Sequence, residues 1–238
     1  MVAEDSAATL TSALVSIPTR NPPGQESACS HYIRDWLVEA GIQAQLIPRP
    51  FVDRPQVLAV VEGFNPGPTL ALNGHIDVVP EGDASRWSVP PFSGQVIDGH
   101  VCGRGATDMK GGLVAMMLAA EVMSRQRQKL KGRLVLQFAI GEEMGEPGTL
   151  QLLEEGPKPD WGIVLEPSDL QIGIASRGLT WWEIMAYGRA SHAGESEDAV
   201  NAIELALALL NNLGSYKRES WTRDQITLYS ANQLARQR

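Results

Sequence analysis

The sequence has few cysteines and no excess of basic charge. Its 238 residues include two cysteines, Cys29 and Cys102. They lack CxxC spacing, which argues against a disulfide framework and against a thiolate zinc site. Lys and Arg number 20 against 28 Asp and Glu, which gives a net charge of −8. A nucleic-acid-binding protein would need a basic face, and an anionic membrane would attract one, so neither partner is expected.

Long apolar runs are also missing. The hydrophobic stretches are interrupted well before the length that a membrane span requires. The first residues, MVAEDSAATL, do not show a basic segment followed by an apolar one, so no signal peptide is expected. Mild acidity in such a chain is typical of simple solubility. We therefore expect a soluble, reduced, cytoplasmic protein.

The apolar pattern predicts alternating helices and strands. Helical spacing covers about 3–15 and 26–40, a stretch from Lys110 onward, and a helix that ends near 152–156. Strand-like runs lie at about 42–47, 57–63, 69–75, 133–140 and 161–167, the last two read as buried strands. Strands that are apolar on both faces indicate a mostly parallel sheet with helices on both faces, and hence an α/β fold.

The pattern changes near residue 175. An alternating run at 178–188 predicts a half-exposed strand, and an amphipathic stretch at 196–214 predicts a helix. We expect residues 1–175 to form a catalytic, metal-binding domain and residues 176–238 to form part of a small α+β lid or dimerisation domain. Beyond about Tyr216 the sequence is polar and predicts no element.

Polar residues cluster at the predicted strand ends. In open α/β sheets, ligands bind at the carboxyl ends of the strands. Five acids and one histidine would converge on one edge there, and so much unpaired negative charge would be costly without one or two divalent cations. The residues are His75, Asp77, Asp108, Glu142, Glu143 and Glu166.

Each spacing has a functional and an ordinary interpretation. Residues i and i+2 of an extended chain point the same way, so Asp77 can hold the second ring nitrogen of a metal-binding His75. Glu142 and Glu143 would point to opposite sides of an extended chain and so have different tasks. Alone, the same residues would fit a loop histidine, a solvated turn and, for Asp108, a helix N-cap. Their joint occurrence favours a metal site. The alternative of a phosphate loop in GRGATDMKGG is weak because GxxxxGK[ST] is absent.

A series of motifs then resembles a known family. The chain is similar to the zinc aminoacylase, acetylornithine deacetylase, succinyl-diaminopimelate desuccinylase and glutamate carboxypeptidase family of co-catalytic metallopeptidases. The resemblance covers about residues 10–213. The motifs, in chain order, are GHIDVVP, PPFSG, DGHVCGRGATDMKGG, GEEMGEPG, DWGIVLEPS and GRASHAG.

The resemblance implies a role for each residue. His75 and Glu166 would bind a first metal, Glu143 a second, and Asp108 would bridge the two. Asp77 would orient His75, and Glu142 would be the general base. The metals would be Zn²⁺, with Co²⁺ or Mn²⁺ as substitutes. The peptide bond after this aspartate is often cis in the family, so the resemblance implies a cis bond after Asp108.

It also implies substrates and partners. The substrate would be an N-acyl amino acid or a small peptide, hydrolysed at its amide bond. His192 of the lid would polarise the scissile carbonyl in the partner subunit of a homodimer.

The chain departs from the family in one ligand. Relatives supply a final histidine to the second metal near the end of a longer chain, and no histidine follows His192 here. We therefore expect a C-terminally truncated member with an incomplete second metal site and uncovered apolar surface. The alternative is a truncated, non-catalytic remnant that binds metal or a partner chain.

Overall fold

A computed structural model describes residues 4–175, 183–192, 194 and 199–214. The chain divides into two compact units, Met1–Leu170 and Gln171–Arg238. Each unit is treated by itself below. The assignment of the two parts as a catalytic domain and a lid stays a prediction.

The first unit is built on a five-stranded sheet in the order β1-β2-β6-β3-β7. Its strands are β1 (Gln43–Ile47), β2 (Gln56–Glu62), β3 (Asn65–His75), β6 (Lys131–Ala139) and β7 (Trp161–Val164). β3 pairs in parallel with both β6 and β7, whereas β2 is antiparallel to β6 and β1 is antiparallel to β2. Every strand except β2 thus runs in one direction. The predicted mostly parallel sheet is confirmed.

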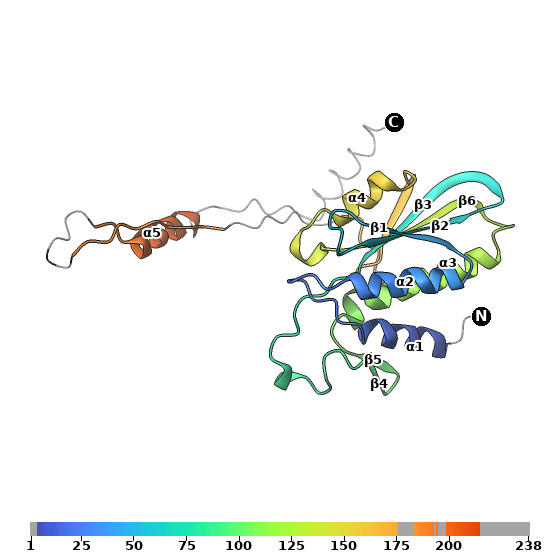
Figure 1. Cartoon of the computed structure of the whole chain (residues 1–238), viewed down its shortest axis with the longest axis horizontal. Helices are drawn as coiled ribbons and strands as arrows, with labels where there is room; N and C mark the ends of the chain where they lie inside the picture. The colour runs from blue at the N-terminus through green and yellow to red at the C-terminus, as the bar shows by residue number, and fades with distance from the viewer. Residues whose placement is uncertain (1–3, 176–182, 193, 195–198, 215–238) are drawn as a thin grey trace. The chain divides into compact units, whose positions relative to one another are not determined.

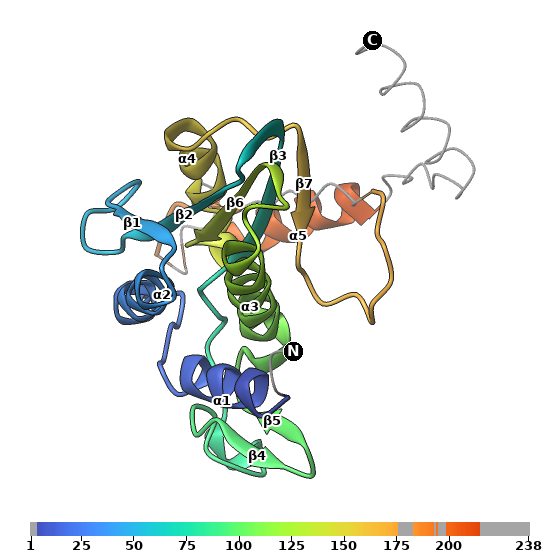
Figure 2. The ribbon, with the colours of Figure 1, turned by 90° about the vertical axis from the view of Figure 1, so that its right-hand side faces the viewer.

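Helices cover both faces of this sheet, as predicted (Figures 1 and 2). α1 (Glu4–Val15), α2 (Ser27–Glu39) and α3 (Gly111–Arg125) lie on one side, and α4 (Gly148–Glu155) lies on the other. Alternate residues of the central strand β6 point to different layers: Leu134, Leu136 and Phe138 join the larger core with α2 and α3. Val135 and Ala139 join the smaller core with Leu152 of α4. Burial on both faces explains the continuous apolar run of β6.

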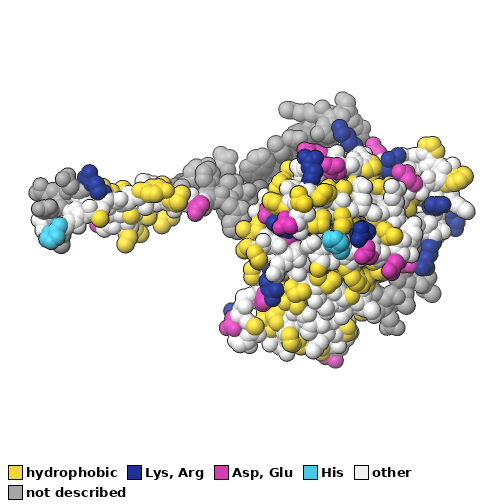
Figure 3. All heavy atoms as spheres, in the orientation of Figure 1, with side chains coloured by type: hydrophobic (Ala, Val, Ile, Leu, Met, Phe, Trp, Pro, Cys, Tyr) yellow, Lys and Arg dark blue, Asp and Glu magenta, His cyan; other side chains and the backbone are white. Residues whose placement is uncertain are grey.

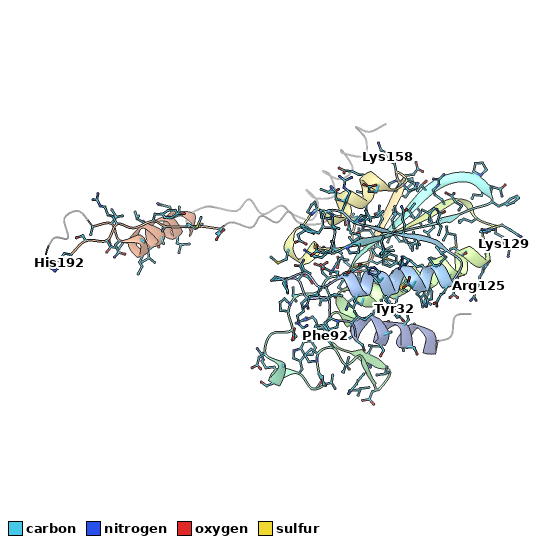
Figure 4. The ribbon with its side chains drawn as sticks, in the orientation of Figure 1. Tyr32, Phe92, Arg125, Lys129, Lys158 and His192 are labelled. Atoms are coloured by element: carbon cyan, nitrogen blue, oxygen red, sulfur yellow. The ribbon has the colours of Figure 1, made fainter. Side chains whose placement is uncertain are left out.

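A long excursion after β3 carries the turn η1 (Ala84–Arg86) and a small hairpin of β4 (Gln95–Ile97) and β5 (His100–Cys102). It is anchored near its start by Arg20, whose guanidinium makes two 2.6 Å contacts with the Glu81 carboxylate. The same guanidinium lies 4.3 Å above the ring of Phe92, which Figure 4 labels. These contacts fix the loop that follows His75 and Asp77.

β7 differs from its prediction as a buried strand. All four of its residues are exposed, and Trp161 is 70% exposed. The strand pairs with β3 along one side only and forms the edge of the sheet. The prediction was wrong because an apolar run shows that a strand can be buried, but does not say which neighbours cover it. The exposed apolar side chains of β7 agree with the uncovered apolar surface that we expected.

In the second unit the described residues contain α5 (Ala202–Gly214) and a single bridge between Arg189 and Val200. Part of the predicted strand at 178–188 lies outside the described residues, and residues 183–188 form no strand. α5 confirms the predicted amphipathic helix in part, because it begins later than residue 196. Figure 3 shows hydrophobic side chains gathered along it. No described helix has the length and apolar character needed to cross a membrane.

Candidate metal centre

Three neighbouring strands deliver the predicted residues to one edge of the sheet. His75 is the last residue of β3 and pairs in register with Ala139, the last residue of β6. Glu142 and Glu143 follow β6, and Glu166 follows β7. Because these three strands are parallel, their carboxyl ends meet at the same edge. The expected convergence of the side chains is therefore what the sheet produces.

His75 stands at the centre of the cluster and is only 2% exposed. Its Nδ1 lies 2.8 Å from the backbone oxygen of Asp77, and 3.6 Å from the Asp77 carboxylate. Its Nε2 faces three carboxylates: Asp108 at 3.1 Å, Glu166 at 3.6 Å and Glu142 at 3.9 Å. Since Nδ1 is held by Asp77, Nε2 is the nitrogen that can bind a metal.

Asp108 is carried by a kinked turn, η2 (Ala106–Lys110), that directly precedes α3. The bond between Asp108 and Met109 is cis, as the resemblance implied. Met109 is fully buried, and its sulfur lies 3.2 Å from the backbone nitrogen of His75. Lys110 is also fully buried and donates from Nζ to the carbonyls of Leu14 (2.9 Å) and Ile17 (2.7 Å). The turn is thus fixed on both sides of the carboxylate.

Glu142 and Glu143 do not lie in extended chain, contrary to the geometry we expected. They begin a short helical turn, η3 (Glu142–Met144), bounded by Gly141 (φ +80°) and Gly145 (φ +66°). Their backbone amides donate to the two oxygens of the Asp77 carboxylate, at 3.2 and 3.1 Å. Asp77 therefore contacts both His75 and this turn, and it is fully buried.

Glu166 is placed by the pairing of β7 with β3. The amide of Leu165 continues this pairing with a 3.0 Å bond to the carbonyl of Asn73. Gly112, at the start of α3, packs against the same residue: an added Cβ there would lie 2.6 Å from the Leu165 carbonyl oxygen. The glycine pair after Asp108 thus brings this turn close to the end of β7.

The cluster holds more negative charge than its own cation can balance. Burial, together with the nearby Asp108 carboxylate, raises the pKa of Glu143 and of Glu166. Burial lowers the pKa of His75, but Asp77, Glu166 and Glu142 outweigh it and raise the pKa to about 9. Each of these shifts shows a site in which carboxylates repel one another and attract a proton or another cation.

The donor atoms fit a divalent metal. Two groups have ligand atoms within 4.8 Å of one another: His75 with Glu142 and Glu166, and His75 with Asp108 and Glu143. One imidazole with two carboxylates is a donor set that zinc accepts. Both groups depend on His75, so the described residues provide one histidine-containing site at a time. The roles given to the individual residues stay predictions.

His192 belongs to the second unit and is labelled in Figure 4. It is exposed, and its Nδ1 accepts a 3.2 Å hydrogen bond from the amide of Gly194. It lies in the loop that the Arg189–Val200 bridge closes. Its predicted role at a partner's site stays a prediction.

One contact of the site was missed by sequence reasoning. Asn21 is 3% exposed and donates from Nδ2 to the Asp77 carboxylate at 3.1 Å. It lies in the loop after α1, in an Asn-Pro-Pro-Gly sequence. No spacing links it to residue 77, so only the fold could reveal the contact.

Comparison with known proteins gives related hydrolases. The chain is 33% identical over 221 residues to N-formyl-4-amino-5-aminomethyl-2-methylpyrimidine deformylase of Halalkalibacterium halodurans, covering 88% of this chain and 52% of that protein. It is 31% identical over 202 residues to a probable succinyl-diaminopimelate desuccinylase of Staphylococcus epidermidis, covering 84% of this chain and 49% of that protein. The chain therefore spans about half the length of the curated relatives it matches.

Solved structures agree on the fold. An M20 family metallo-carboxypeptidase, Sso-CP2 from Sulfolobus solfataricus, superposes with a TM-score of 0.59 at 25% identity, covering 67% of this chain and 37% of that one. A tripeptidase from Staphylococcus aureus superposes with a TM-score of 0.63 at 19% identity, covering 89% of this chain and 57% of that one. The sequence profile described as peptidase family M20/M25/M40 matches residues 71–230, which include every predicted site residue. The chain belongs to peptidase family M20/M25/M40.

Proposed function

We propose that this chain is a zinc-dependent hydrolase of amide bonds in N-acyl amino acids or small peptides. One observation carries the proposal: the Nε2 of a buried histidine faces three carboxylates within 3.9 Å at the carboxyl edge of the sheet. Membership of the family and relatives named as a deformylase and a desuccinylase support amide hydrolysis. The acyl group and the amino acid are left open.

The residues divide the work as follows. His75, Asp108 and Glu166 hold the first zinc ion, and Glu143 with Asp108 holds a second, weaker one. When bound, zinc lowers the pKa of water and polarises the amide carbonyl. Glu142 takes a proton from the attacking water and delivers it to the leaving nitrogen. Its side chain is 57% exposed, so substrate can reach it.

The number of tight zinc sites tests the ligand assignment. Because both described candidate groups depend on His75, we expect one tightly bound zinc ion per chain in isothermal titration calorimetry. Two tight ions per chain would contradict the sharing of His75. Co²⁺ and Mn²⁺ should compete for the same site.

Hydrolysis tests the reaction. We expect zinc- or cobalt-dependent release of amino acid from an N-acetyl, N-formyl or N-succinyl amino acid, or from a dipeptide. Glu142→Ala should abolish it. Glu154→Ala serves as the matched control, because Glu154 is an exposed residue of α4 with no predicted role in the site. Zinc binding without hydrolysis of any of these substrates would instead favour the non-catalytic alternative, a remnant that binds metal or a partner chain.

The proposal includes a homodimer formed through the second unit. α5 exposes Ile203, Leu205, Leu207 and Leu210, each by 48% or more. Ile203, Leu207 and Leu210 are spaced i, i+4 and i+7 and so share one face of the helix. An exposed apolar face of this kind is typical of interaction surfaces. Sedimentation equilibrium should give a dimer, and replacement of Leu207 and Leu210 by Lys should give a monomer.

A further inference from the structure

Beside the candidate metal centre lies a buried network of charged groups to which none of the predicted roles assigns a task. It joins Glu26, Arg54 and Glu146 to Asn21, and through Asn21 to Asp77. These residues come from four separate segments of the chain, since Asn21 and Glu26 share the loop between α1 and α2. We propose that Arg54 and Glu146 are positioning residues, which hold Asp77 and the Glu142–Glu143 turn in the arrangement that binds zinc. The inference rests on the proposed function, because it concerns the same metal.

Glu146, like Asp77, contacts the turn that carries Glu142 and Glu143. Its amide donates to the carbonyl of Gly141 at 2.8 Å and so closes the loop that contains both predicted glutamates. Its carboxylate lies directly over Gly141, where an added Cβ would come within 2.2 Å of Oε2. The conformation of this loop therefore depends on where the Glu146 carboxylate is held.

Arg54 holds that carboxylate in a fork. Nη1 and Nη2 contact the two oxygens of Glu146 at 3.1 and 2.7 Å. The adjacent edge of the same guanidinium, which shares Nη2, contacts the two oxygens of Glu26, with Nε at 2.9 Å and Nη2 at 2.6 Å. Glu26 is fully buried and the Arg54 side chain is 11% exposed. A planar guanidinium can make two such paired contacts at once, and an ammonium cannot.

Asn21 carries the connection to the metal ligands. Its Nδ2 lies 3.3 Å from the Glu146 Oε2 and 3.1 Å from the Asp77 Oδ2. That same Oδ2 accepts the amide of Glu143, and the other oxygen of Asp77 accepts the amide of Glu142. A change in the position of the Glu146 carboxylate would thus move the Asn21 amide and, through it, Asp77. Asp77 in turn contacts both His75 and the turn that carries Glu142 and Glu143.

Metal binding is the readout that separates this role from simple loop stabilisation. Glu146→Gln removes the charge while keeping the size of the side chain. Its matched control is Glu155→Gln, because Glu155 also pairs with an arginine, Arg49, at 2.7 Å but in α4. Residues that hold metal ligands in place commonly change metal affinity by about 10- to 100-fold, and we expect about tenfold weaker zinc binding for Glu146→Gln. The control should bind zinc as the unaltered chain does.

The visible spectrum of the Co²⁺-loaded protein gives a second readout. The intensity of its bands depends on coordination geometry, so Glu146→Gln should alter it and Glu155→Gln should not. Arg54→Lys keeps the charge but loses the paired contacts, and it should weaken zinc binding as well. Urea unfolding of each variant monitors folding. If Glu146→Gln fails to fold, Arg54→Lys decides the outcome.

Equal zinc affinity, within about twofold, for the unaltered chain and the folded variants would overturn the inference, as would an equal loss for Glu155→Gln. A failure of the unaltered chain to bind zinc would be a different result. It would overturn the proposed function, and the inference with it.

Discussion

The strongest test of the site is the pH dependence of zinc binding, because the histidine must lose its proton before it can bind a metal. The carboxylates around His75 raise its pKa to about 9. Below that pH, each further decrease of one pH unit lowers the deprotonated fraction of His75 about tenfold. Zinc affinity should therefore rise about 50-fold between about pH 7 and pH 9, whereas an ordinary histidine with a pKa of about 6.5 would give a rise of less than about twofold.

Two measurements would show the effect. Competition with a chelator of known affinity gives the zinc dissociation constant at each pH. Calorimetry at about pH 7.5 in buffers of different ionisation enthalpy counts the protons released, and we expect about one per zinc ion from His75. His100→Gln is the control, since His100 is exposed and its ring contacts only the backbone of Asp98 among the interactions described. Zinc affinity that stays flat from about pH 7 to pH 9, with almost no proton release, would refute the reasoning.

The same shift has a consequence for stability, with a definite sign. In the metal-free chain the folded state binds the His75 proton more tightly than the unfolded state does. The stabilisation is therefore complete below about pH 6.5 and is lost as the pH rises through about 9. Zinc binds the deprotonated ring, so added zinc should raise the urea midpoint more at high pH than at low pH.

Two substitutions test the supporting contacts. Asp77→Asn replaces a carboxylate oxygen, which accepts a hydrogen bond from a backbone amide, by an NH₂ group that cannot accept one. Zinc affinity should therefore fall about 10- to 100-fold in calorimetry. Unchanged affinity would contradict the role of Asp77. Gly74→Ala would bring a Cβ to within 2.7 Å of Met109 Cε, and urea unfolding should show a loss of about 1–3 kcal/mol. Gly162→Ala in β7 is its control, because an added Cβ there meets nothing within 4 Å; a similar loss in both variants would contradict the close packing of Met109 on β3.

The sequence predicted the elements of the first unit well, for a physical reason. β6 was expected at 133–140 and is found at Lys131–Ala139, because an apolar run that packs against helices on both faces has few alternatives. The direction of β2 could not be predicted, since the residue pattern of a strand is the same whichever way it runs. The exposure of β7 could not be predicted either, because it depends on what lies beside the strand.

His75, Glu143 and Glu166 were predictable as neighbours because they end or follow strands, and parallel strands end at one edge. Asp108 was predictable from its glycine-rich loop before a helix. Asp77 was also found from its spacing to His75. The residues around them were not predictable: Asn21, Arg54 and Glu146 are brought together only by the packing of loops far apart in the chain. The turn at Glu142 was missed because its two positive-φ glycines permit both a strand end and a turn.

The reversed direction of β2 has a consequence for the charge of the site. The parallel strands β3, β6 and β7 bring His75 and the acids that follow each strand to the candidate metal centre. β2 runs the other way and brings the residues that precede it to this edge, and Arg54 lies two positions before its first residue, Gln56. If this seven-residue strand ran the other way, Arg54 would lie about 24 Å from the edge, at about 3.4 Å per residue. The buried Glu26 and the partly buried Glu146 would then lack a cation. The one antiparallel strand therefore supplies a positive charge that an all-parallel sheet would have left at its opposite end.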